Sequence, residues 1–251
     1  MRFLIIAILI GAAGLCLHEL TMLGVRIHRG TKIAEASRPF ERVDPAAAHR
    51  ILVVGDSTGV GTGAARPEDS VAGRIAGEFP GIEVVNRARN GATATQVLGQ
   101  LESVSASGFD IVLVQVGGND ILRFTGLGEL RDTLREVLKT AVEKGRAVIF
   151  ISTGNAGLAP AFFPPVSWLY TFRTRQARAI FMDIAQETGA RYVDLFRERG
   201  NELFLGDPGR YYSADYLHPG SEGYRVWYEE MKRQANLAGI LGRETAAPGG
   251  R

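Results

Sequence analysis

Short apolar runs alternate with helical stretches along most of this chain, and that alternation limits the folds that it can adopt. The runs are expected to be strands because they are rich in branched residues and end at Gly or polar turns. They lie near residues 51–55, 82–86, 110–116, 146–151 and 191–194. Helices are predicted over residues 127–142, 173–188 and 221–234. The sequence therefore predicts an α/β fold, a flavodoxin-like three-layer α/β/α sandwich with a five-stranded parallel sheet.

The two ends of the chain differ from this body. Residues 3–17 are all apolar or small, and an extension to residue 25 is long enough to cross a bilayer. We therefore expect residues 1–25 to be an N-terminal anchor, with a cleaved signal peptide as the alternative. Residues 26–49 are expected to form a stalk, residues 50–238 the folded domain, and residues 239–251 a disordered tail.

Charge and composition exclude several classes of function. A formal net charge of +2 over 251 residues argues against a dedicated nucleic-acid binder. The only cysteine is Cys16, and a body with one histidine cannot build a zinc site of the usual kind. We therefore expect no metal, no cofactor and no nucleic-acid partner. The expected partner is a bacterial-type cell membrane, contacted through residues 3–25, with its side undecided and an exported form as an alternative.

A serine, a histidine and an aspartate are the candidate catalytic residues. Ser57 follows the first buried strand at a glycine-rich turn, where α/β folds usually place functional groups. His218 is the only histidine beyond residue 50, so a histidine base that activates this serine must be His218. Asp215 precedes it by three residues and could orient the imidazole. Asp194 and Asp207 could also do so, and the choice of Asp215 depends on spacing alone.

Two glycine-rich loops after later strands are candidates for an oxyanion hole. Gly91 lies in a loop past the second strand, and Gly117-Gly118-Asn119-Asp120 follows the third. Glycine lets the backbone approach a ligand closely, and the Asn119 amide adds a side-chain donor. Attack on an ester needs such donors for the developing negative charge. Three strand ends with such loops, together with the His218 loop, favour catalysis over ordinary turns.

These segments resemble the four sequence blocks of the SGNH hydrolases, the GDSL-type esterases and lipases. The matching segments, within about residues 50–235, are Gly55-Asp56-Ser57, Gly91, Gly117-Gly118-Asn119-Asp120 and Asp215-Tyr216-Leu217-His218. The resemblance implies that Ser57 is the nucleophile, His218 its base and Asp215 the partner of the base. It also implies an oxyanion hole made by the Ser57 amide, the Gly91 amide and the Asn119 side chain.

The resemblance also implies an activity. It points to a serine ester hydrolase without a cofactor, which acts through an acyl-enzyme on an acyl or acetyl ester of a small molecule, lipid or glycan. An acyltransferase or carbohydrate deacetylase with the same site is an alternative, as is a catalytically silent, membrane-tethered binding module. Thr58 stands where the name of the family expects Leu, at a position that does not touch the chemistry.

One long connection, residues 153–168, is too apolar for a free loop, and its prolines forbid an ordinary helix. It follows the carboxyl end of a strand. Phe162 and Phe163 are therefore predicted to wall the substrate pocket, or the segment to contact a membrane. A loop that simply packs on the domain is the alternative.

Overall fold

The computed structural model describes residues 2–242, and for most of residues 2–23 it describes the backbone alone. The predicted tail therefore lies outside the described residues from residue 243 onward. Its first residues belong to the folded domain, because helix α10 (Leu237–Ile240) and the buried Leu241 extend the core beyond residue 238.

Five parallel strands form a sheet in the order β2-β1-β3-β4-β5. Their bounds are β1 (His49–Gly55), β2 (Ile82–Asn86), β3 (Phe109–Gln115), β4 (Gly145–Ile151) and β5 (Arg191–Val193). Val53 of β1 pairs with Leu113 of β3, and Val114 of β3 pairs with Phe150 of β4. Because β2 and β3 flank β1 on opposite sides, the connections that leave β1 and β2 run in opposite directions. A crevice forms at the carboxyl edge of such a sheet.

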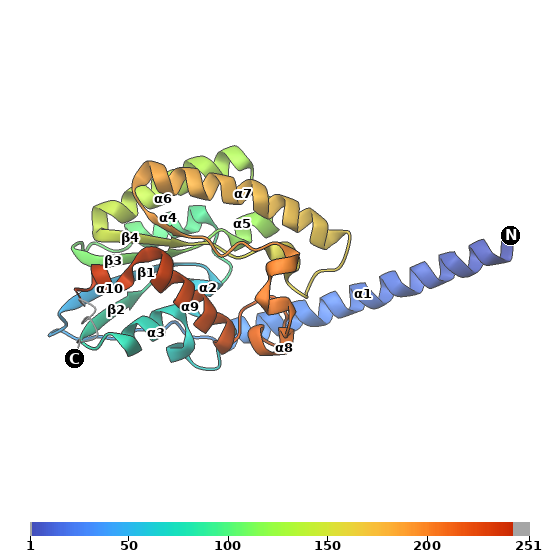
Figure 1. Ribbon diagram of the computed structural model, residues 1–251, viewed down its shortest axis with the longest axis horizontal. Coiled ribbons are helices and arrows are strands. Elements are labelled where there is room, and N and C mark those ends of the chain that lie inside the picture. Colours follow the sequence, from blue (N-terminus) through green and yellow to red (C-terminus); the bar gives the residue numbers. More distant parts are fainter. Residues whose placement is uncertain (1, 243–251) are drawn as a thin grey trace, which may run out of the picture.

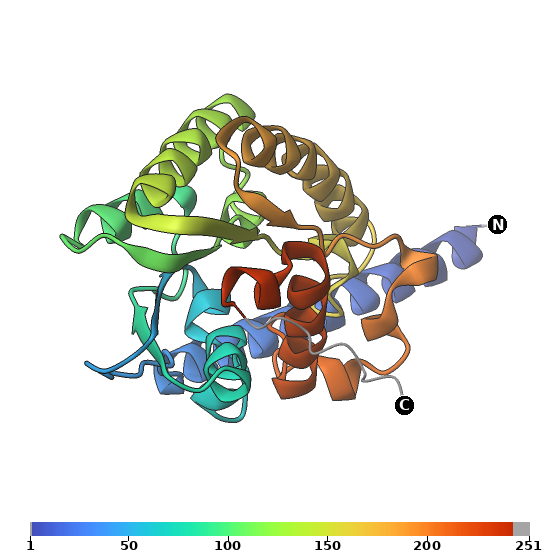
Figure 2. The ribbon, with the colours of Figure 1, turned by 60° about the vertical axis from the view of Figure 1, so that its left-hand side comes forward.

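Helices cover both faces of the sheet (Figures 1 and 2). One face carries α3 (Val71–Glu78), α9 (Ser221–Ala235) and α10, and the other carries α4 (Ala94–Glu102), α6 (Leu127–Lys144) and α7 (Val166–Thr188). Ile51 and Val53 pack in the first layer, whereas Leu52 and Val54 pack in the second, as the alternation of side chains along a strand requires. The predicted three-layer sandwich with a five-stranded parallel sheet is confirmed.

Shorter helices complete the described chain. They are α2 (Ser57–Val60), α5 (Gly118–Leu122), α8 (Pro208–Tyr211), and the 3₁₀ turns η1 (Pro67–Asp69), η2 (Ala156–Leu158), η3 (Arg199–Asn201) and η4 (Leu203–Leu205). Helix α7 begins at Val166, earlier than the predicted residue 173. Pro165 directly precedes its first turn, where a missing N–H costs no helical hydrogen bond, so the prolines of this connection precede a helix instead of preventing one.

The N-terminal helix α1 extends from Arg2 to Ala36, well into the predicted stalk (Figure 1). The residues that follow pack on the domain. Phe40 is buried in the core, and Arg42 exchanges two backbone hydrogen bonds with Val84 of β2, at 3.0 and 2.9 Å. Residues 26–49 therefore contact the folded body along much of their length and do not form a free stalk.

The structure does not support the predicted transmembrane helix. Within residues 2–242, as far as they are described, no helix is both long enough and apolar enough to cross a bilayer. Most side chains of residues 3–17 lie outside the described part of the chain, so membrane contact through residues 3–25 stays a prediction.

Candidate active site

The turn after β1 places Ser57 at the carboxyl edge of the sheet. Gly55 ends the strand with φ of +152°, and a Cβ at this position would lie 2.1 Å from the carbonyl oxygen of Gln115. Glycine is therefore required here. The amide of Asp56 donates to the same carbonyl at 2.8 Å, and Ser57 follows as the first residue of α2.

His218 lies between Ser57 and Asp215. Its Nε2 is 3.0 Å from Ser57 Oγ, and its Nδ1 is 2.6 Å from Asp215 Oδ2. Ser57 and Asp215 are buried, whereas 17% of the His218 side chain is exposed. The three predicted catalytic residues thus form one continuous chain of hydrogen bonds.

The surroundings of Asp215 keep this acid ionised. Its Oδ1 accepts hydrogen bonds from Ser213 Oγ at 2.7 Å and from the amides of Leu217 and His218, both at 3.0 Å. Burial alone would raise the pKa of Asp215, but the hydrogen bond with His218, the charge of that ring and the other donors lower the pKa to about 2. An ionised carboxylate only accepts hydrogen bonds, so His218 carries a proton on Nδ1 and its Nε2 can accept one from Ser57.

The two rival acids lie elsewhere. Asp194 forms hydrogen bonds with the guanidinium group of Arg178 at 2.5–3.1 Å. Asp207 caps helix α8, where its side chain accepts from the amide of Arg210 at 3.3 Å. The geometry therefore favours Asp215 as the acid beside His218.

The two glycine-rich loops extend to the pocket that Ser57 lines. Gly91 has φ of +77°, in the left-handed region that favours glycine. One N–H of the Asn119 side-chain amide donates to the carbonyl of Ala92 at 3.1 Å, which ties the loop after β3 to the loop after β2. The amide has a second N–H for a ligand. Ser57, Gly91 and Asn119 line one common pocket.

Two buried acids within the motifs were given no role by sequence reasoning. Oδ1 of Asp56 accepts from both the amide and the hydroxyl of Thr58, at 2.8 Å each, and so shapes the turn that carries Ser57. Burial raises the pKa of Asp56 to about 6, against the opposing effect of the Thr58 hydrogen bonds. Oδ2 of Asp120 accepts from the amide of Ala94 at 3.1 Å and so fixes the start of α4. Both acids lie within the matched sequence blocks, and that position is the sequence signal that could have identified them.

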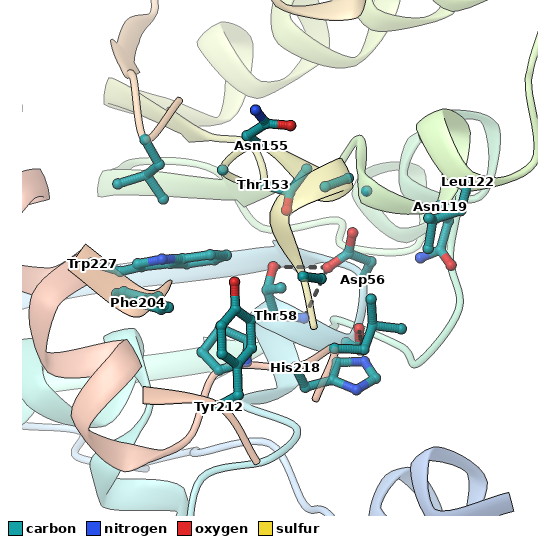
Figure 3. A pocket seen from close by; sticks show the side chains of 18 of the residues that line it. Asp56, Thr58, Asn119, Leu122, Thr153, Asn155, Phe204, Tyr212, His218 and Trp227 are labelled. Atoms are coloured by element: carbon teal, nitrogen blue, oxygen red, sulfur yellow. Dashed lines mark hydrogen bonds between the residues drawn. The ribbon is translucent and has the colours of Figure 1, made fainter. Parts of the chain in front are cut away.

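A pocket of about 500 Å³ opens in front of Ser57. Figure 3 shows Phe204, Tyr212 and Trp227 on one side of Thr58, with Asn119 on the other. Charged and polar residues also line the pocket, namely Asn155, Arg197, Asn201, Glu202 and Glu230. Trp227 of α9 is 7% exposed and also lines the pocket.

Phe162 and Phe163 are not among the residues that line this pocket. The ring of Phe162 packs instead on Tyr170 of α7, with 4.6 Å between the ring centroids. Ala156 and Ala159, from the same connection, line the pocket. The segment therefore walls the pocket, but through residues other than its phenylalanines.

Within residues 2–242, no group of three or more His, Cys, Asp or Glu side chains is placed to hold a metal ion. The sheet edge brings together a serine hydroxyl, an imidazole within hydrogen-bond distance of it, a carboxylate behind the imidazole, and the residues Gly91 and Asn119 of the same pocket. This combination is suited to nucleophilic attack on a carbonyl group.

Residues 53–226 match the model of the GDSL-like lipase/acylhydrolase family. The chain is 28% identical over 187 residues to the GDSL-like esterase Rv1075c of Mycobacterium tuberculosis. That match includes 70% of this chain but only 58% of the length of the relative.

Several solved structures share this fold. TesA superimposes with a TM-score of 0.59 and 22% identity, over 76% of this chain and 99% of its own. Axe2, an acetylxylan esterase from Geobacillus stearothermophilus, gives a TM-score of 0.58 and 20% identity, over 82% of this chain and all of its own. An extracellular lipase from Streptomyces rimosus gives 0.60 and 19%, over 74% of this chain and all of its own.

These matches confirm the resemblance that the four sequence blocks indicated. The chain belongs to the GDSL-like lipase/acylhydrolase family, a family of hydrolases that act on ester bonds.

Proposed function

We propose that this protein hydrolyses carboxylic esters through a serine acyl-enzyme. The observation that carries the proposal is the chain of hydrogen bonds from Asp215 through His218 to Ser57, at 2.6 and 3.0 Å. An ionised Asp215 accepts the hydrogen bond of His218 Nδ1, which leaves Nε2 of the neutral ring to accept the proton of Ser57.

The first half of the reaction transfers the acyl group to the enzyme. His218 Nε2 takes the proton of Ser57 Oγ as this oxygen bonds to the carbonyl carbon of the ester. The amides of Ser57 and Gly91 and the side chain of Asn119 donate to the negative oxygen that forms. The intermediate then expels the alcohol oxygen, which receives the proton from His218. The products are a free alcohol and Ser57 esterified by the acyl group.

The second half repeats these steps with water. His218 removes a proton from a water molecule, whose oxygen attacks the carbonyl carbon of the acyl-enzyme. Collapse of the second intermediate breaks the bond to Ser57 Oγ, which takes its proton back from His218. The carboxylic acid leaves and the enzyme returns to its starting state. If an alcohol replaces the water, the same residues perform acyl transfer.

A carbohydrate ester is the second candidate substrate, and the lining of the pocket favours it. Phe204, Tyr212 and Trp227 line the pocket together with Arg197 and Glu202, and a mixture of aromatic faces and polar groups suits a polar ring. Axe2, which shares this fold, acts on acetylxylan. Acetylated sugars therefore belong beside simple esters in any test of activity.

The test is steady-state hydrolysis of p-nitrophenyl esters and acetylated sugars by the wild type, Ser57→Ala and Ser103→Ala. Ser103 is the matched control, since its hydroxyl donates to the carbonyl of Gln100 outside the pocket. We expect turnover by the wild type and the control, and loss of at least 10³-fold in Ser57→Ala. No turnover of any ester by the wild type would favour a silent binding module. Product transferred to an added alcohol would favour an acyltransferase.

A further inference from the structure

We infer that the segment of α1 from Gly30 to Ala34 is a wall of the active-site pocket and limits the size of the ester that binds. Gly30, Thr31 and Ala34 line the same cavity as Ser57 and His218. Ala34 follows Gly30 by four residues and Thr31 by three, and these spacings place the three positions on one side of the helix. The inference rests on the proposed function, because it concerns the selectivity of that reaction.

Hydrogen bonds hold this helix against two loops of the site. The side chain of Asn90, next to Gly91, donates to the carbonyl of Ala34 at 2.8 Å. Asn90 is fixed in turn by the hydroxyl of Thr62, which donates to its Oδ1 at 2.6 Å. One turn before Gly30, Arg26 Nη1 donates to the carbonyl of Ala161 at 3.1 Å, in the connection that follows β4. The helix is therefore anchored beside both the candidate oxyanion loop and the connection that walls the pocket.

Gly30 also contacts the candidate catalytic acid. A Cβ at this position would lie 3.1 Å from Asp215 Oδ2, the oxygen that faces His218 Nδ1. This distance is shorter than an ordinary van der Waals contact, so a side chain here would press on the acid. The absence of a side chain lets the helix approach the Asp215 loop, and the small residues that follow leave the pocket open along it.

The size of the residues on this face has a direct consequence for substrates. Thr31 and Ala34 contact the pocket, but the distances that define the chain from Ser57 to Asp215 do not involve them. A larger residue at either position would remove space from the pocket without removing a catalytic group. The wall is uncharged, so the part of the ester that lies along it is an uncharged acyl or alkyl group.

The experiment compares Thr31→Leu and Ala34→Leu with the wild type on two series of substrates. One series is p-nitrophenyl esters of increasing acyl length, and the other is acetate esters of alcohols of increasing size. Ala36→Leu is the matched control, because it makes the same change on α1 at an exposed position outside the pocket. A short fluorophosphonate and circular dichroism check that each variant retains a reactive site and its fold.

We expect each pocket variant to lower, by tenfold or more, the ratio of kcat/KM for the largest good substrate of at least one series to kcat/KM for p-nitrophenyl acetate. The responding series identifies which part of the ester lies along α1. The inference is overturned if selectivity stays as in the wild type in both series, if all esters lose activity equally, or if Ala36→Leu has the same effect.

Gly30→Ala supplies an independent readout. Its methyl group would push Asp215 Oδ2 by a few tenths of an ångström, so kcat should fall by a similar factor for every ester, with little change in chain-length preference. The experiments distinguish a failure of the inference about α1 from a failure of the proposed ester hydrolysis. In the first case Ser57→Ala is inactive and the α1 variants keep wild-type selectivity, whereas in the second the wild type hydrolyses no ester or Ser57→Ala retains activity.

Discussion

Replacing Asp215 with Asn changes the chemistry of one atom while preserving the shape of the side chain. The remaining carbonyl oxygen can still accept the three hydrogen bonds that Oδ1 accepts from Ser213, Leu217 and His218. The other oxygen becomes an NH₂ group, which cannot accept from His218 Nδ1. The ring must then carry its proton on Nε2, the nitrogen that has to accept a proton from Ser57.

This wrong tautomer should cost about 10⁴ in kcat, equivalent to about 5 kcal/mol of transition-state stabilisation. KM should change little, because Asp215 is not among the residues that line the pocket. Activity should recover partly at higher pH, where hydroxide can assist.

The same substitution should lower stability in a pH-dependent way. The pKa of Asp215 falls from its ordinary value of 3.8 to about 2 in the folded protein, which corresponds to on the order of 2 kcal/mol. A depressed carboxyl pKa stabilises the folded state above about pH 4, and this contribution is lost as the pH falls through 2. The free energies of unfolding of the wild type and Asp215→Asn should therefore differ at pH 7 and converge in that acidic window.

The assay is kcat and KM on one ester, together with urea unfolding at pH 7 and pH 3, for Asp215→Asn, Asp194→Asn and Asp207→Asn. The last two should keep near-normal turnover, because these acids pair with Arg178 and cap α8, away from His218. If Asp215→Asn retains wild-type kcat while one of the others collapses, the catalytic acid is not Asp215 and the reasoning from geometry is refuted.

Two further predictions concern the loops around Ser57. Asn119→Ala should lower kcat by about 10²–10³ with KM nearly unchanged, and an unchanged kcat would remove Asn119 from the oxyanion hole. For Asp56, burial raises the pKa from 3.8 to about 6, so the folded state binds more protons than the unfolded state between these values. The free energy of unfolding should therefore fall by on the order of 3 kcal/mol as the pH rises from about 4 to 6. Asp56→Asn, measured by urea unfolding, should remove this fall, and an identical pH dependence in the variant would contradict the assignment.

The parts of the fold that could be predicted from the sequence are those that local patterns determine. Buried strands such as Ile51–Val54 are continuous apolar runs, and their alternation with amphipathic helices leaves few arrangements other than a covered parallel sheet. The candidate triad was accessible for a similar reason. His218 is the only histidine beyond residue 50, and Asp215 precedes it by three positions.

The role of α1 could not be predicted, because its contacts leave no mark in the sequence. It approaches the pocket through Gly30, Thr31 and Ala34, and it is held partly through a backbone carbonyl that accepts from Asn90. Small residues and backbone groups give no hydrophobic periodicity, so residues 26–49 had the pattern of a stalk. Phe162 was placed in the pocket because it is large and apolar, but stacking on Tyr170 uses that surface instead.

The most direct measurement is the mass of the peptide that carries the label after reaction of the protein with a fluorophosphonate. An activated serine reacts with this reagent once per site, and the phosphorus becomes bonded to its Oγ. We predict a single label, on Ser57, in the wild type, and slow or absent labelling in His218→Ala, because the base 3.0 Å from Ser57 Oγ is removed. A label on another serine, or equally fast labelling of Ser57 in His218→Ala, would contradict the proposed mechanism.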